Sequence, residues 1–78
     1  MKNKRIIFTK HSLDRIKKRG LTEEWVINII QKPTEILPLE SDHTQEFRQE
    51  RDGSYYYAVV EHKDSVMVVI TNGECGKK

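Results

Sequence analysis

The sequence predicts an α+β fold, with two N-terminal helices packed on an antiparallel β-sheet meander. Three observations lead to this prediction. Apolar residues have helical spacing before Pro33, and the period changes towards two after it. The dipeptide Asp52-Gly53 separates two strand-like runs, and a type I′ hairpin turn requires the positive φ angles that such residues tolerate. The 78 residues, of which 36% are hydrophobic, are enough for one domain, spanning 1–78, with a thin core.

The beginning of the chain is expected to form a short strand and a helix. Arg5 to Thr9 is a β-branched and aromatic run, suited to an edge strand or to an extended lead-in. From about Lys10 to Arg19 the pattern turns helical, with Thr9 as the N-cap and Gly20 where a left-handed C-cap belongs. The first helix is therefore short and basic.

A second helix is expected between Leu21 and Pro33, because proline cannot continue a helix. Thr22 can cap its N-terminus, and Glu23 and Glu24 stand in the first turn, where the helix dipole favours negative charge. Its apolar side chains fall on one side and are expected to pack on the sheet: Trp25, Val26, Ile29 and Ile30.

The rest of the chain is expected to form strands. Pro38 confines the weak strand at 34–39 to a sheet edge or turns it into a loop. A second tight turn is expected near Lys63-Asp64. The last strand is expected to end at Asn72-Gly73, which leaves residues 73–78 as a flexible tail. The three strands of the meander are expected over residues 45–51, 54–61 and 66–71.

Alternation assigns the side chains of the meander to two faces. If both turns hold two residues, Arg48, Tyr57 and Ile70 lie level across the sheet. One face then carries Arg48, Tyr55, Tyr57, Val59, Val66, Val68 and Ile70. The other carries Phe47, Tyr56, Ala58, Val60, His62, Met67, Val69 and Thr71. We expect the first, more β-branched face to pack on the helices, which leaves the second for a cleft, a partner or a dimer contact.

The net charge of +2 conceals an uneven distribution. Residues 1–20 hold eight basic side chains and one acidic side chain, a net +7, whereas residues 21–78 hold six basic and eleven acidic ones, a net −5. Such asymmetry indicates a field directed at an anion such as nucleic acid, or electrostatic contact between the two parts of the domain. It also arises when lysine and arginine merely solvate a helix.

Other features narrow the classes of function. No apolar run approaches the roughly 20 residues of a membrane span, and no signal-type stretch follows the N-terminus, so we expect a cytoplasmic protein without a membrane partner. The single cysteine, Cys75, cannot form an internal disulfide. Together with Cys75, the three histidines lack the spacing of metal ligands, and we expect neither a metal nor another cofactor.

Four side chains gather on one stripe of the first expected helix, at about 100° per residue: His11, Arg15, Lys18 and Arg19. Leu13 and Ile16 point to nearly the opposite side, so the helix can bury them and still expose the stripe. Guanidinium groups offer forked donors to a phosphate, and histidine moves a proton near neutral pH. The combination suits phosphodiester cleavage, although an amphipathic basic helix also produces this spacing without such a function.

The segment from Thr9 to Thr22 resembles the start of the family called domain of unknown function 4258 (DUF4258), with its His-x-x-x-Arg-x-x-x-Arg-Gly-Ile/Leu pattern at His11, Arg15, Arg19, Gly20 and Leu21. The resemblance covers most of the chain, including an arginine in the first strand of the meander, Arg48. The family is similar to the bacterial RelE/ParE-type toxins, which share a microbial ribonuclease-like architecture. The resemblance therefore implies toxin-like RNA chemistry and a cognate antitoxin as partner.

A metal-independent endoribonuclease is the first hypothesis that follows. His11 would transfer the proton of a ribose 2′-hydroxyl or of the leaving oxygen. The phosphate would be held by three arginines, and further side chains would bind the nucleic acid: Arg15, Arg19 and Arg48 for the phosphate, and Lys10, Lys18 and Tyr56 for the rest of the RNA.

Two other hypotheses stay open. In one, the same surface binds RNA or a protein without breaking a bond. The related toxins often place a Tyr or His after the last strand, and this chain has Thr71-Asn72-Gly73 there, which favours binding alone. In the other, the chain forms a homodimer through an apolar sheet face that contains Tyr56, Val60, Met67 and Val69.

Overall fold

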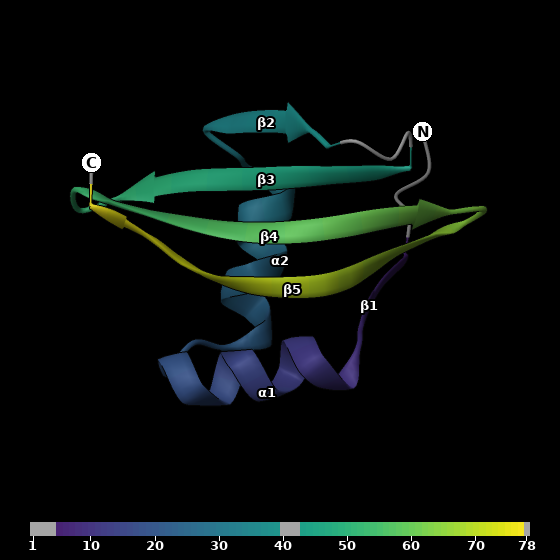
Figure 1. The fold of residues 1–78 in the computed structure, drawn as a ribbon, viewed down its shortest axis with the longest axis horizontal. Coiled ribbons are helices and arrows are strands. Elements are labelled where there is room, and N and C mark those ends of the chain that lie inside the picture. Colours follow the sequence, from purple (N-terminus) through teal and green to yellow (C-terminus); the bar gives the residue numbers. More distant parts are fainter. Residues whose placement is uncertain (1–4, 40–42, 78) are drawn as a thin grey trace.

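Figure 1 shows the fold as a computed structural model, which describes residues 5–39 and 43–77. The elements follow the order β1 (Arg5–Phe8), α1 (Lys10–Arg19), α2 (Glu23–Gln31), β2 (Glu35–Pro38), β3 (Thr44–Arg51), β4 (Ser54–Lys63) and β5 (Val66–Lys77). The strands form one five-stranded sheet in the order β1-β5-β4-β3-β2, in which β1 is parallel to β5 and the other pairs are antiparallel. The predicted α+β class is confirmed.

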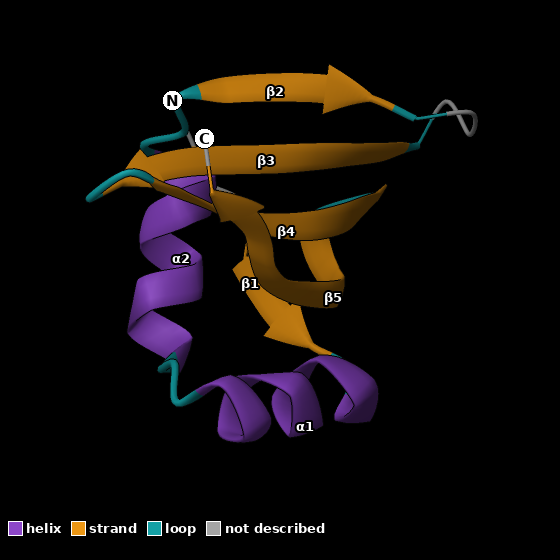
Figure 2. Cartoon of the chain, turned by 60° about the vertical axis from the view of Figure 1, so that its left-hand side comes forward, coloured by secondary structure: helices purple, strands orange, loops and turns teal. Residues whose placement is uncertain are grey.

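The two helices occupy different places relative to the sheet. Helix α2 lies across one face, behind the sheet in Figure 1, and α1 lies alongside β5, roughly crosswise to α2 (Figure 2). We call the face covered by α2 the helix-packed face and the opposite one the helix-free face. Within residues 5–39 and 43–77, no helix is long and apolar enough to cross a membrane.

Both helices begin at the residues that the sequence predicts. The Thr9 side chain accepts a hydrogen bond from the Ser12 backbone nitrogen at 3.1 Å, and Thr22 accepts one from Trp25 at 3.1 Å. Each cap satisfies one of the backbone donors that the first turn of a helix leaves unpaired. Gly20 follows α1 at φ 70°, a left-handed conformation that glycine adopts without a Cβ clash. The predicted caps are confirmed.

The hairpin between β3 and β4 also matches its prediction. Asp52 has φ 55° and Gly53 has φ 82°, as a type I′ turn requires. The two-residue turn sets Arg51 opposite Ser54 and Arg48 opposite Tyr57. The prediction that Arg48 and Tyr57 lie level across the sheet is therefore confirmed.

The register of β5 differs from the prediction. The second turn lies one residue later, because Lys63 pairs with Val66, and a bulge follows between the pairs of Val59 and Val60. Each change moves β5 along β4, so Tyr57 pairs with Gly73 rather than with Ile70. Asn72-Gly73 does not end the strand. Of the tail expected at 73–78, residues 73, 74, 76 and 77 pair with β4 instead, and residue 78 lies outside the described residues.

The helices pack on the face opposite to the predicted one. The core consists of the buried side of α2, of alternate residues of the strands and of one residue of α1. These are Val26, Ile29 and Ile30 of α2, Phe47, Ala58, Val60 and Val69 of the strands, and Ile16 of α1. Ala58 is fully buried, and a residue this small lets a helix approach the sheet closely. The face chosen from its β-branched content holds Arg48, Tyr55 and Tyr57 and carries no helix.

The predicted dimer face is wrong for the same reason. Val60 and Val69 are fully buried within the chain, and Tyr56 and Met67 pack against the same core. Val60 and Val69 are therefore occupied within the chain, and a homodimer through another surface stays a prediction. The bulge also moves Thr71, expected beside Val69, to the side of Val59, with which it pairs.

Candidate nucleic-acid interface

Helix α1 has a buried side and an exposed basic side. Ser12 and Ile16 are buried, and Leu13 is half-buried against the core. The prediction that Leu13 and Ile16 lie on the packed side of this helix is confirmed. The exposed side carries five basic side chains and one acidic side chain: Lys10, His11, Lys17, Lys18, Arg19 and Asp14. The sequence-predicted residues of α1 therefore face outward, except Arg15.

Arg15 lies at the border between the two sides and reaches across β5. Its Nε donates to the backbone oxygen of Asn72 at 3.2 Å, and its Nη2 donates to the Tyr57 hydroxyl at 3.3 Å. The path runs over Gly73, where a Cβ would lie 3.1 Å from Arg15 Nη2 and 3.2 Å from the Tyr57 hydroxyl. The absence of a side chain at residue 73 is what lets the guanidinium reach the helix-free face.

Arg15 has no carboxylate partner among the residues that the structure describes. Of the side chains that the structure describes, no carboxylate oxygen lies within 4.0 Å of its guanidinium. Both of its partners are neutral, and they occupy two of the five N–H donors that a guanidinium offers. A half-buried cation with free donors and no counter-charge attracts an anion, and the fork of an arginine fits a phosphate.

The other three members of the predicted stripe lie beside Arg15 on α1. At about 100° per residue, His11, Lys18 and Arg19 fall within about 60° of Arg15 around the helix axis. All three are exposed, and the His11 side chain forms no hydrogen bond with any residue in the described ranges. The stripe therefore presents Lys18, Arg19 and the His11 imidazole to solvent beside the half-buried Arg15.

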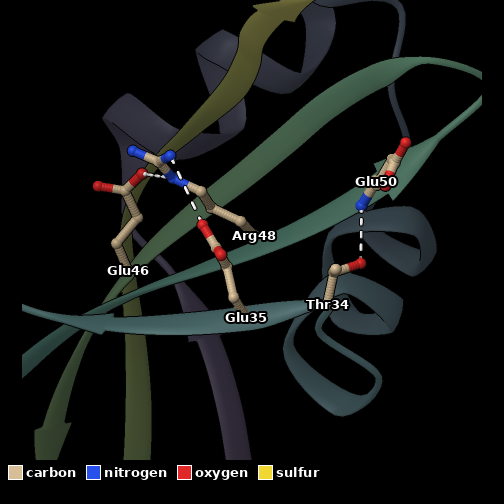
Figure 3. A network of polar contacts seen from close by, with 5 residues as sticks. All are labelled: Thr34, Glu35, Glu46, Arg48 and Glu50. Atoms are coloured by element: carbon tan, nitrogen blue, oxygen red, sulfur yellow. Dashed lines mark hydrogen bonds and ion pairs between the residues drawn. The ribbon is translucent and has the colours of Figure 1, made fainter. Parts of the chain in front are cut away.

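Arg48 does not join this group of cations. It pairs across the sheet with Tyr57, so Arg15 and Arg48 approach Tyr57 from opposite sides. Its Nε donates to Glu46 Oε2 at 2.7 Å, and its Nη1 lies 3.8 Å from Glu35 Oε2 (Figure 3). These two carboxylates offset its charge. Glu50 lies on the same face as Glu46, because alternate residues of β3 share one face. Its backbone nitrogen donates a hydrogen bond to the Thr34 side chain.

Tyr56 lies on the other side of the sheet from Tyr57. Its ring packs against Trp25 of α2, with ring centroids 5.1 Å apart and planes at 58°. The guanidinium of Arg51 lies 4.7 Å from the centroid of the Trp25 ring and completes a small stack. Tyr56, predicted to bind nucleic acid, is therefore separated from the α1 stripe. Tyr57, which the sequence analysis did not select, occupies the place beside Arg15.

No pocket is enclosed by the residues that the structure describes. Within the same residues, no three His, Cys, Asp or Glu side chains gather closely enough to hold a metal ion. The candidate interface is thus an open surface, formed by one side of α1 and the adjoining part of the helix-free face. Comparisons with protein-family models, curated proteins and solved structures give no match to this chain.

Proposed function

We propose that the protein binds the phosphate backbone of RNA in the cytoplasm, through Arg15 and the exposed basic side of α1. The observation that supports the proposal best is the uncompensated guanidinium of Arg15, held between Asn72 and Tyr57 with donors to spare. Lys18 and Arg19 lie on the same side of the helix and can contact neighbouring phosphates. Phosphate contacts of this kind supply most of the affinity of sequence-independent binding.

Binding without cleavage fits the surface better than catalysis does. Stabilising a pentavalent phosphate requires several cations directed at one point. Arg48 does not meet this requirement, because its guanidinium interacts with two carboxylates. His11 is exposed, and the described residues form no pocket around it. An open, positively charged surface suffices for holding a polyanion.

An RNA-binding measurement tests the proposal. Fluorescence anisotropy with a labelled ten-nucleotide RNA would compare the wild type with Arg15→Gln and with a matched control, Arg51→Gln, which removes the same charge from an exposed residue beside Trp25. We expect Arg15→Gln to weaken binding about tenfold and Arg51→Gln to change it less than about twofold. Circular dichroism would confirm that both variants fold. Equal losses in the two variants would contradict a specific role for Arg15.

A metal-independent endoribonuclease is the second candidate. The observation that favours it is the position of His11, one turn before Arg15 on the same side of α1. A labelled RNA incubated with the wild type in the presence of a chelator would be cleaved, and His11→Ala would abolish cleavage without loss of binding. RNA that stays intact while it is bound supports binding alone.

The toxin-like role and the cognate antitoxin rest on the resemblance to DUF4258 and to the RelE/ParE-type toxins. Growth arrest on expression of the wild type, relieved by His11→Ala, would support that role. Normal growth at a verified level of folded protein would count against it.

A further inference from the structure

We infer that the helix-free face selects single-stranded RNA, with bases stacked on Tyr57 and Tyr55 while Arg15 holds an adjacent phosphate. The inference rests on the proposed RNA binding and adds the class of substrate. Aromatic rings on an open sheet face stack unpaired bases in a sequence-tolerant way. What distinguishes this face is the combination of two tyrosines, each paired with a glycine of β5, and Arg15, which has no carboxylate partner among the described residues.

The two tyrosines are adjacent on the helix-free face. Residues 55 and 57 of β4 point to the same side of the sheet, because side chains alternate along a strand. Tyr57 pairs with Gly73 of β5 and Tyr55 pairs with Gly76, so neither ring has a side chain opposite it on that strand. Both rings are half-buried rather than covered. A planar base would approach the rings from the solvent side of the sheet, because the Tyr57 ring edge and the Arg15 guanidinium already lie over Gly73.

The Tyr57 ring is held in place for such a contact. Its hydroxyl accepts a hydrogen bond from Arg15 Nη2 at 3.3 Å, and its side chain is half-buried, so part of it is accessible to solvent. A phosphate on the remaining donors of Arg15 would lie within one nucleotide of the ring. Stacking and charge neutralisation then act on the same nucleotide.

The distribution of charge predicts how the RNA lies on the helix-free face. The far side of the face, at β2 and β3, carries Glu35, Glu46 and Glu50 around a single arginine, Arg48, so these four groups have a net negative charge. The near side, at β5 and α1, carries the uncompensated cation Arg15 and the exposed Lys18 and Arg19. The backbone of the RNA should therefore follow α1, and its bases should turn inward over β4. In a duplex the bases are paired and stacked internally, so they cannot reach the tyrosines.

The decisive experiment compares binding of a labelled single-stranded decauridylate with that of a ten-base-pair RNA duplex. We expect the wild type to prefer the single strand at least about tenfold. Tyr57→Leu should lose most of that preference, whereas its duplex affinity should match that of Tyr57→Phe, because both variants lack the hydroxyl that holds Arg15. Tyr57→Phe should keep the preference within about threefold, because the ring remains. Tyr55→Leu should lose part of it.

The outcomes separate this inference from the proposed function. Equal affinity of the wild type for both RNAs, or a single-strand preference that Tyr57→Leu retains, overturns stacking and leaves phosphate binding by α1 intact. Failure of the wild type to bind either RNA overturns both proposals.

A measurement on the wild type alone keeps the inference testable if Tyr57→Leu fails to fold. Photocrosslinking with 5-iodouridine in the decauridylate, mapped by mass spectrometry, should label Tyr57 or Tyr55, because this reaction favours a stacked aromatic ring. Labels found only on α1 would overturn the inference. Trp25, the only tryptophan in the sequence, packs on the opposite face with Tyr56 and should stay unlabelled.

Discussion

Gly73 is the point at which Arg15 crosses β5. A Cβ there would lie 3.1 Å from Arg15 Nη2 and 3.2 Å from the Tyr57 hydroxyl, closer than ordinary van der Waals contact. We expect Gly73→Ala to lower the free energy of unfolding by about 1 kcal/mol, because the added methyl group overpacks this contact. Urea denaturation measures the change. The cost should shrink in an Arg15→Ala background, and an equal cost in both backgrounds would contradict this explanation.

Asn72 joins β5 to α1 from within the core. It is fully buried, and its Nδ2 donates to the Ser12 backbone oxygen at 3.1 Å. We expect Asn72→Ala to lower the free energy of unfolding by about 2 kcal/mol, since it removes a buried hydrogen bond and leaves a void. Asn72→Asp should cost more, because it buries a carboxyl group without a described donor. A thermal or urea transition unchanged by either substitution would show that this link is dispensable.

Arg48 shows which part of a site a sequence can predict. Its place on the face of Tyr57 follows from alternation and from the Asp52-Gly53 turn, and the structure agrees. Its neutralisation by Glu46 and Glu35 depends on side-chain conformations and on the pairing of β2 with β3. Charge counting cannot reveal such a pairing, because it does not show which opposite charges meet.

At the scale of elements, the turn between β3 and β4 depends on backbone conformation alone. Gly53 has φ 82°, and nothing lies within 4 Å of the place where its Cβ would stand. We expect Gly53→Ala to destabilise the protein by about 1 kcal/mol through left-handed strain. Asp52→Asn, at φ 55°, should be neutral or slightly stabilising, because asparagine tolerates this region. Urea denaturation of both variants tests the pair, and equal losses would contradict a purely conformational cause.

The helices were predictable because their signals are local. Thr9, Gly20 and Thr22 act on residues within one turn of themselves, so the chain needs no tertiary contact to mark these ends. The register of β5 is different. At its bulge, the Thr9 hydroxyl donates to the carbonyl oxygens of Val69 and Ile70, both at 3.2 Å. A contact between residues about sixty positions apart thus accompanies the bulge, and periodicity within the strand does not contain it.

The choice of sheet face failed because both faces contain apolar residues. β-Branched content favoured the side of Val59 and Val68, but that side also carries Arg48, Tyr55 and Tyr57. A helix packs more closely on small side chains, and Ala58 provides one on the opposite face. Side-chain volume along β4 was therefore a better signal than β-branching.

At the scale of the whole molecule, the +7 of residues 1–20 against the −5 of residues 21–78 should govern how RNA affinity depends on salt. Three phosphate contacts, by Arg15, Lys18 and Arg19, predict a slope of about −2 for log K against log salt concentration with single-stranded RNA. Arg15→Gln should reduce its magnitude by about 0.7. Anisotropy titrations between about 50 and 200 mM salt measure both slopes. A slope near zero would contradict a phosphate-based interface.

The parallel pairing of β1 with β5 has a consequence for synthesis on the ribosome. Arg5 to Phe8 find their strand partners only at Val66 to Val69, and α1 docks on the same strand. The hairpin of β3 and β4 can form earlier, because its partners are close in the chain. The basic segment at 5–19 therefore stays without its strand partner, next to ribosomal RNA, until β5 has left the exit tunnel.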